Sequence, residues 1–450
     1  MGNSYLWSFV GALLGSIITA ILAPLAINLT IDKIIKKYIS GPSLKDSLLS
    51  YTYSYHNIPW LRLVEVLRRA ETGKPLLKPS DRLKTDDILS HVYLSPAQLS
   101  CPPVRDYYSI DTRVKIGTAS GKPLNLASPF IIAAPSTGLQ VSDTVRHALI
   151  DAANSSGTAL LTGEQVFSTN ELGRTDRLIL TLDQPDSPML TDANLKQAHM
   201  VELKLGQGSV SPLNWEQAGF NPLSQQTYLP RFFNLPSGRK ELSHLVRELK
   251  KLSEGCPVAV RLAGSTRIEK DLEILAQAEV DTVIIEGYES SSLLAPAVTA
   301  ANFGLPLAYA LARAHRFLYQ QKLNNQIDLI ASGGIWDAGD SLKLLALGAQ
   351  AVLLDNVVLF ALLHRQITRA VPWQPVESLI LADGKKAAKL NEKEASQALD
   401  NFMEALRQEV AIAVATLGKQ RVSELSWEDL MTSDNGLLQT TAIASVWQGV

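Results

Sequence analysis

Lys204, Gln207 and Arg261 are polar side chains within or just after apolar, strand-like runs. Lys204 and Gln207 belong to residues 200–208, and Arg261 interrupts the apolar run 258–262. An ionisable group on a buried strand is costly unless it has a partner, so such groups mark functional sites more often than not. A salt bridge at the rim of the sheet is the alternative. We predict that these side chains lie at C-terminal strand ends and belong to a catalytic or binding site.

A glycine pair follows another buried strand. Ser332-Gly333-Gly334 ends the apolar run, a helix follows, and a strand at residues 351–354 leads to Asp355-Asn356. The last two strands of a (β/α)8 barrel commonly hold a phosphate in this way, because glycines let backbone N–H groups approach the oxyanion. An ordinary glycine turn is the alternative. The motif predicts a phosphorylated cofactor or substrate.

Apolar runs and helical patterns alternate through most of the chain. The strand-like runs are residues 129–134, 158–161, 200–205, 258–262, 282–286, 327–331 and 351–354. Helical patterns separate most of them, at residues 143–153, 241–252, 268–278 and 340–347. This alternation predicts an α/β fold, a parallel (β/α)8 TIM barrel.

The N-terminal segment predicts a membrane anchor. Residues 1–31 carry no charged side chain and are long enough for a span of ~20 apolar residues. A cleaved signal peptide is the alternative, but no basic residue precedes the apolar run. Lys33, Lys36 and Lys37 follow, which places the barrel on the cytoplasmic side of a single-pass membrane protein. A Gly11-xxx-Gly15 pair would allow a homo-oligomer.

Composition and spacing divide the chain into four segments. We predict a transmembrane anchor at 1–31, a helical neck or linker at 32–104, the barrel at 105–385, and C-terminal helices with a tail at 386–450. The chain has 450 residues, 46% of them hydrophobic, and a net charge of −2, which gives no sign of nucleic-acid binding.

The cysteines and histidines form no metal motif. Cys101 and Cys256 are the only cysteines, and the seven histidines are scattered. The sequence therefore predicts no disulfide framework, no metal site and no iron–sulfur cluster.

The order of several motifs resembles the flavin domain of glutamate synthases. Residues 132–138 look like that family's Ala-Pro-Met-Ser-like strand end, and Thr162-Gly163-Glu164 looks like its Ser-Gly-Glu-Gly turn. Residues 202–208 are similar to its Glu-Ile-Lys-x-x-Gln-Gly motif. Arg261 falls where the family has a lysine, and Ser332-Gly333-Gly334 falls on its phosphate loop.

The resemblance covers about residues 105–431 and implies an FMN-dependent oxidoreductase that acts on CH–NH2 donors. In the family, 2-iminoglutarate, formed from 2-oxoglutarate and ammonia, takes a hydride from reduced FMN to give glutamate. Lys204 and Gln207 would face the flavin and the substrate carboxylate. Arg261 would stabilise the negative charge that develops on the reduced flavin. The catalytic residues implied are Glu164, Lys204, Gln207 and Arg261.

The resemblance also implies a cofactor site. Its residues are Ala134, Pro135, Ser136, Thr162, Gly287, Ser332, Gly333, Gly334, Asp355 and Asn356. The first four would line the isoalloxazine ring, and the Ser332–Gly334 turn would hold the phosphate.

Several positions depart from the family pattern. The three-cysteine iron–sulfur cluster and the glutaminase domain have no counterpart, so electrons and ammonia would come from outside this chain. Residues 287–292 replace a Gly-Gly-Thr-Gly loop, and residues 209–212 replace Lys-Pro-Gly. Asp355 stands in the second phosphate loop, where a carboxylate repels a phosphate dianion unless it is protonated or bridged by a cation.

Three interpretations remain open. The first is a glutamate synthase-type FMN enzyme with an external electron donor. The second is a related flavin barrel with another small-molecule substrate. The third is a membrane-tethered barrel that has lost catalysis and serves as a ligand-binding or scaffold module.

Overall fold

The computed structural model describes residues 60–76, 88–96, 98–135, 140–183, 187–206, 238–290, 302–370 and 376–447. All of them belong to one compact unit.

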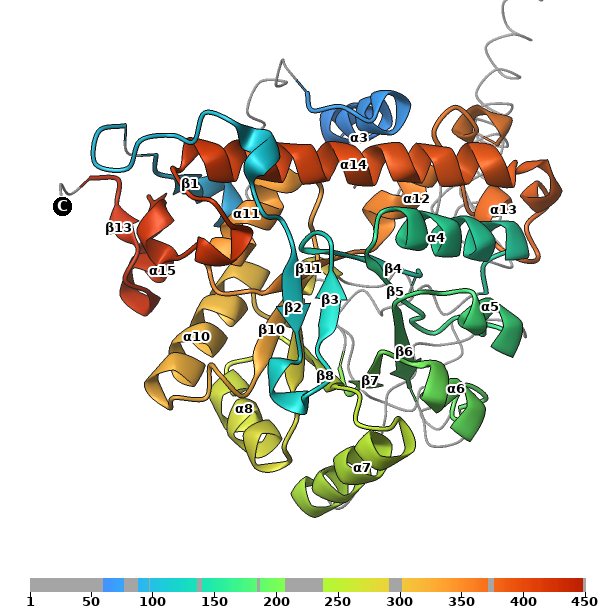
Figure 1. The fold of residues 1–450 in the computed structure, drawn as a ribbon, viewed down its shortest axis with the longest axis horizontal. Coiled ribbons are helices and arrows are strands. Elements are labelled where there is room, and N and C mark those ends of the chain that lie inside the picture. Colours follow the sequence, from blue (N-terminus) through green and yellow to red (C-terminus); the bar gives the residue numbers. More distant parts are fainter. Residues whose placement is uncertain are drawn as a thin grey trace, which may run out of the picture. The chain divides into compact units, whose positions relative to one another are not determined.

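A closed barrel of eight parallel strands forms the centre of this unit (Figure 1). Its strands are β4 (Phe130–Ala133), β5 (Ala159–Leu161), β6 (Leu178–Leu182), β7 (Met200–Lys204), β8 (Val258–Ala263), β9 (Thr282–Glu286), β10 (Asp328–Ser332) and β11 (Ala351–Leu354). They pair in chain order, and β11 closes the barrel against β4. The predicted parallel (β/α)8 barrel is confirmed.

Seven of the barrel strands coincide with apolar runs that the sequence predicts, and β6 does not. Its run Leu178–Leu182 has five residues, all buried. A short apolar run cannot be distinguished from a buried helical segment by periodicity alone, because it completes too few repeats.

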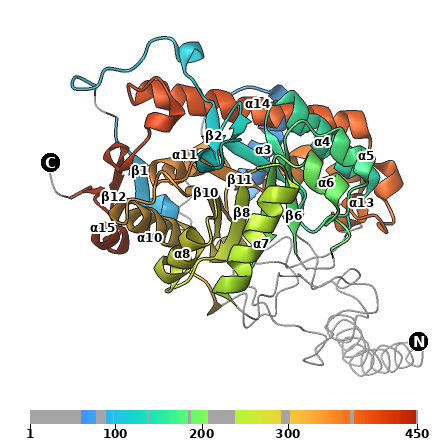
Figure 2. The ribbon, with the colours of Figure 1, turned by 60° about the horizontal axis from the view of Figure 1, so that its bottom comes forward.

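Helices follow the strands and cover the outside of the barrel. They are α4 (Asp143–Ser155), α5 (Thr169–Gly173), α6 (Asp192–Gln197), α7 (Arg239–Leu252), α8 (Ile268–Gln277), α10 (Leu307–Gln320), α11 (Ala338–Ala346) and α12 (Asn356–Leu362). Figure 2 shows α7, α8 and α10 in succession along one side. Capping side chains fix where helices begin: the Ser142 hydroxyl accepts from the N–H of Val145 at the start of α4, and Asp337 caps α11.

The hairpin β2 (Val114–Ile116) and β3 (Leu124–Leu126) lies across the N-terminal strand ends. The carboxylate of Asp328, the first residue of β10, accepts the N–H of Gly117 at 2.7 Å. Gly117 has a φ of 70°, and a Cβ there would lie 2.4 Å from Pro257. The hairpin therefore closes this end, and the opposite end is left for a site.

The N- and C-terminal parts of the described chain pack together. Helix α3 (Trp60–Thr72) lies beside α14 (Glu392–Thr416), and Arg69 donates to Glu409 at 2.9 Å. Strand β1 (Val92–Leu94) pairs with β12 (Leu430–Thr432), which also pairs with β13 (Ala444–Ser445). Short helices α13 (Glu377–Ile380) and α15 (Asn435–Thr440) complete this part. The predicted segment boundaries themselves stay predictions.

The predicted single-pass membrane location is corrected here. Within the described ranges, no helix is long and apolar enough to cross a membrane. The 25-residue helix α14 is long enough, but it carries charges such as Glu404, Arg407 and Glu409, which a hydrocarbon core would not solvate. The predicted anchor, residues 1–31 with the Gly11–Gly15 pair, lies outside the described residues. A membrane location is therefore unsupported.

Candidate functional site

Lys204 and Glu164 form a buried ion pair at the C-terminal end of the barrel. Lys204 is the last residue of β7, and Glu164 lies in the loop after β5. Their side chains are only 1% and 6% exposed, and the Lys204 ammonium donates to the Glu164 carboxylate. The structure thus brings together two of the residues that the sequence predicts to be catalytic. Another of the four predicted catalytic residues, Gln207, lies outside the described residues.

Arg261 lies between two buried carboxylates on the neighbouring strands. Its Nε donates to Glu202 on β7, and its Nη1 is 3.3 Å from Glu286 Oε1 on β9. Arg261 is paired with Lys204 in the β7–β8 register, so both cations reach the same end of the barrel. The side chains of Arg261, Glu202 and Glu286 are each no more than 3% exposed.

Arg261 stays charged and has unused hydrogen-bonding capacity. Burial alone would lower the pKa of the guanidinium, but the charges of Glu202 and Glu286 raise it above its ordinary value. Arg261 Nη2 and Glu286 Oε2 are buried, and neither has a hydrogen-bond partner among the residues described. Since buried polar atoms in native proteins are nearly always paired, these two indicate a polar ligand in the barrel centre.

A line of hydroxyl groups connects Glu202 to the predicted flavin-lining residue Thr162. The Thr181 hydroxyl donates to Glu202 and accepts the N–H of Gly163 at 3.1 Å. The Thr162 hydroxyl accepts the N–H of Thr181 at 3.0 Å. These bonds hold the carboxylate of Glu202 in place and fix the loop that carries Glu164.

Ala134 and Pro135 follow β4 and are buried. Gln165 Nε2 donates to the Pro135 carbonyl at 2.8 Å, so the loops after β4 and β5 are joined above the barrel. Ser136, predicted to line the same site, lies outside the described residues.

The Ser332-Gly333-Gly334 turn packs against the loop after β9. A Cβ on Gly333 would lie 3.1 Å from Ser290 Cβ, and one on Gly334 would lie 3.0 Å from Glu289 Cβ. Both glycines also have a positive φ, of 115° and 66°. This turn therefore requires glycine even without a ligand. The N–H groups of Gly333 and Gly334 make no hydrogen bond within the described ranges, so they can receive an anion.

Carboxylates surround this turn. Ser332 Oγ donates to Glu286 Oε1 at 3.2 Å, and Ser290 Oγ donates to the same oxygen at 2.6 Å. Glu289 accepts the N–H of Leu307 at the start of α10, at 3.2 Å.

Asp355 follows β11 and accepts the N–H of Asn356, which starts α12. Burial raises the pKa of Asp355 to about 6, the Asn356 N–H opposes this rise, and Glu286 adds to it. The positive charge of Arg261 lowers the pKa of Asp355 and so opposes the effect of Glu286. This carboxyl group is therefore ready to take up a proton near neutral pH.

The completed site is polar, buried and rich in carboxylates. It gathers two cations, Lys204 and Arg261, with four carboxyl groups: Glu164, Glu202, Glu286 and Asp355. No group of His, Cys, Asp and Glu side chains suited to a metal ion occurs in the part of the chain that the structure describes. The arrangement suits the binding of a polar organic ligand.

The sequence analysis does not assign Glu202 or Glu286 to the site. Glu202 lies within a motif used for the resemblance, and Glu286 ends the predicted strand 282–286. The signal that indicates Lys204 and Arg261, an ionisable side chain on an apolar strand, applies to both glutamates as well.

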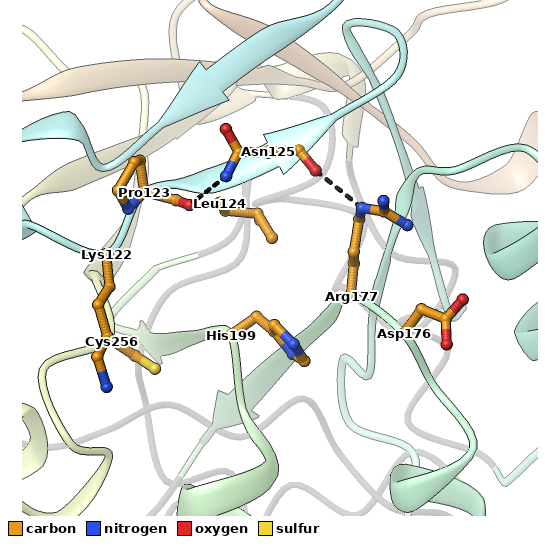
Figure 3. A pocket seen from close by; sticks show the side chains of 8 residues that line it. All are labelled: Lys122, Pro123, Leu124, Asn125, Asp176, Arg177, His199 and Cys256. Carbon is orange, nitrogen blue, oxygen red and sulfur yellow. Dashed lines mark hydrogen bonds between the residues drawn. The ribbon is translucent and has the colours of Figure 1, made fainter.

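A separate hollow of about 590 Å³ lies at the opposite end of the barrel (Figure 3). It is lined by Lys122, Pro123, Leu124, Asn125, Asp176, Arg177, His199 and Cys256. Arg177 Nε donates to the Asn125 carbonyl at 2.8 Å, and Cys256 Sγ lies 3.0 Å from the Ala198 carbonyl. Burial, with the charge of Arg177, lowers the pKa of His199. None of the predicted site residues lies here, and barrel active sites form at the other end.

Comparison with known proteins identifies related sequences. Residues 224–420 match a family model described as the conserved region in glutamate synthase. A glutamate synthase large subunit-like protein of Rhizobium meliloti is 24% identical and covers 82% of this chain and 89% of its own length. An archaeal glutamate synthase [NADPH] of Methanocaldococcus jannaschii is 27% identical over 56% of this chain, which spans about half (51%) of that relative.

Solved structures resemble the fold. A mutant flavocytochrome b2 with benzoylformate has a TM-score of 0.52 at 15% identity, with 85% of each chain covered. At this identity the likeness shows the barrel architecture alone.

Proposed function

We propose that this chain, which carries the conserved glutamate synthase region and has glutamate synthase-like homologues, is an FMN-dependent oxidoreductase of glutamate synthase type. Its substrate would be 2-oxoglutarate with ammonia, or a closely related imino acid. The observation that carries the proposal is Arg261, a buried cation whose Nη2 has no hydrogen-bond partner among the described residues, beside the Lys204–Glu164 pair.

The residues present fit the cofactor. The unpaired Nη2 of Arg261 would donate to a ring carbonyl or ring nitrogen, and Thr162, Ala134 and Pro135 would line the ring. The backbone N–H groups of the Gly333–Gly334 turn would receive the phosphate. When bound, FMN supplies the hydride that reduces a C=N bond.

The chain's own side chains would position the substrate and balance charge. Lys204 would bind a substrate carboxylate, while Glu164 accepts a hydrogen bond from its ammonium group and fixes its direction. Glu202 and Glu286 would hold the Arg261 guanidinium so that it cannot turn away. The low exposure of these groups keeps water from the reacting atoms and strengthens each interaction.

Electrons would come from an external donor. Several relatives are named glutamate synthase [NADPH], and NADPH is the donor that we propose for this chain as well. The chain's two cysteines do not match the family's three-cysteine set, so no step is assigned to an iron–sulfur cluster.

Arg261→Met tests the proposal, because methionine keeps much of the volume and removes the charge. Purified full-length protein is reconstituted with FMN and its visible absorption and flavin affinity are measured. We expect the native protein to bind FMN and the variant to bind it at least about tenfold more weakly, the value of one charged hydrogen bond of ~1.5–3 kcal/mol.

Lys250→Met is a matched control, since Lys250 lies on α7 outside the barrel and pairs with Asp281. It should leave FMN affinity unchanged. Equal affinity of the Arg261→Met variant and the native protein would contradict the assignment of Arg261 to the flavin site.

A second interpretation is a barrel that binds a ligand without catalysis. The carboxylates around the Gly333–Gly334 turn favour it, because they weaken the binding of a phosphate. A native protein that binds no flavin in the reconstitution above would support this interpretation.

A further inference from the structure

Asp355 is the residue that most clearly distinguishes this barrel from an ordinary phosphate site. Ser332 pairs with Leu353 in the β10–β11 register, so the turn that begins at Gly333 and the loop that begins at Asp355 leave neighbouring strand ends. Phosphates in (β/α)8 barrels lie at this place, after the last two strands. A phosphate received by the Gly333–Gly334 turn would therefore lie at the strand end next to the one that carries Asp355.

The charged groups around Asp355 do not offset a phosphate. Glu286 on β9 and Arg261 on β8 face it, and the Asn356 N–H on α12 donates to it. Arg261 already serves Glu202 and Glu286, so its charge is shared between two carboxylates. Glu289 packs on Gly334 and adds a further acidic side chain to the turn. Asp355 is half-buried, so water would screen the repulsion between an ionised Asp355 and a phosphate dianion only in part.

Asp355 can avoid this repulsion by taking up a proton. Its pKa is already raised to about 6, because it is buried and faces Glu286. A neighbouring phosphate favours the neutral form further. A protonated Asp355 is also a hydrogen-bond donor, which suits a phosphate oxygen.

We propose that Asp355 controls the binding of phosphorylated flavin, so that FMN enters the barrel together with a proton that Asp355 binds, whereas riboflavin enters without one. This inference rests on the proposed flavin function and makes Asp355 a determinant of specificity at that same site. Flavin loading would then depend on pH, although the phosphate turn itself has no titrating group.

The test compares FMN with riboflavin on the native protein and on Asp355→Asn. Asparagine keeps the size and the helix-capping ability of aspartate and cannot ionise. Affinities are measured by quenching of flavin fluorescence from pH 5.5 to 8.5, with full-length protein. Asp434→Asn is the matched control, because Asp434 likewise caps a helix, α15, outside the barrel.

We expect FMN affinity of the native protein to fall by up to about tenfold per pH unit above pH 6, as linkage to one proton requires. The Asp355→Asn variant should lose most of the pH dependence of FMN affinity. At pH 8 it should bind FMN at least about tenfold more tightly than the native protein does. Riboflavin should bind both proteins alike, and Asp434→Asn should behave as the native protein does. Calorimetry in two buffers should show uptake of about one proton with FMN at pH 7.5 in the native protein only.

The outcomes separate the two proposals. If riboflavin and FMN both bind and Asp355→Asn changes neither the pH dependence nor the proton uptake, this inference is wrong and the flavin function stands. If neither flavin binds the native protein or Asp355→Asn, the flavin function is wrong and the inference falls with it. Riboflavin binding to Asp355→Asn reports that the variant barrel is intact.

Discussion

Arg261, Glu202 and Glu286 show how the barrel can keep a charge in its interior. A lone guanidinium at 2% exposure would be strongly disfavoured, but two carboxylates offset its desolvation. Within the described residues, Arg261 Nη2 and Glu286 Oε2 still have no hydrogen-bond partner. An interior arranged in this way is less stable than an apolar one of equal volume, which is typical of a binding site.

Asp355 should also make the stability of the flavin-free protein depend on pH. Its folded pKa of about 6 lies above the ordinary value of 3.8, so the folded state holds a proton that the unfolded state releases. Stability is therefore undiminished below about pH 4, falls as pH rises towards 6, and stays reduced above it. Above pH 6 the free energy of unfolding should be lower than at pH 4 by on the order of 3 kcal/mol.

Urea unfolding of native protein and Asp355→Asn at pH 4.5 and pH 7.5 measures this effect. The variant should gain stability relative to the native protein at pH 7.5 and much less at pH 4.5. A difference between the two proteins that is the same at both pH values would show that Asp355 does not titrate in this range.

Single residues could be predicted from the sequence where an ionisable group interrupts an apolar run. Lys204 and Arg261 were found by that rule, and their partners Glu202 and Glu286 obey it too. The pairings were not predictable, because they depend on barrel register: Lys204 lies opposite Arg261, while its carboxylate partner comes from the loop after β5. The catalytic roles of these residues stay predictions.

At the scale of elements, the loop after β9 determines the shape of the neighbouring Ser332–Gly334 turn. Gly287 lies directly after the strand, and a Cβ there would lie 2.1 Å from Glu289 Oε2 and 2.8 Å from the Leu307 nitrogen. Its N–H donates to the Ser332 carbonyl at 3.0 Å. A side chain at this position would push Glu289 away from the start of α10 and disturb the neighbouring turn.

We therefore expect Gly287→Ala to destabilise the protein by about 1–3 kcal/mol, as overpacking of a dense region does. FMN binding should weaken as well. The control is Gly121→Ala, where a Cβ meets nothing within 4 Å and only the φ of 80° opposes the change, by about 1 kcal/mol. Thermal unfolding and FMN titration check both variants. If Gly287→Ala costs no more than Gly121→Ala, the close packing of this loop is not what requires glycine.

Seven of the eight barrel strands were predictable from the sequence, but β6 and the β2–β3 hairpin were not. The alternation of strands and helices was sufficient to predict the barrel, because parallel strands need helical crossovers. Strand β6 was not predicted, although it is longer than β5 and β11, because a short apolar run can equally belong to a buried helix. The hairpin β2–β3 was missed because each strand has only three residues, too few to show alternation.

At the scale of the whole molecule, the barrel, α3 and the C-terminal helices form one unit. Arg62 on α3 pairs with Asp340 on α11, and Arg69 pairs with Glu409 on α14. The residues that the sequence assigned to a neck are thus partly packed on the barrel. Long-range pairs such as these join residues far apart in the chain, which is why segment boundaries drawn from composition could not anticipate them.

Glutamate synthase-type chemistry is the central claim, and glutamate formation tests it most directly. Full-length protein loaded with FMN at pH 6 and reduced chemically without oxygen is mixed with 2-oxoglutarate and ammonium. We predict reoxidation of the bound flavin together with about one glutamate per reduced flavin, as the transfer of one hydride requires. Reduced, flavin-loaded protein that forms no glutamate and stays reduced in the presence of both substrates would contradict the account.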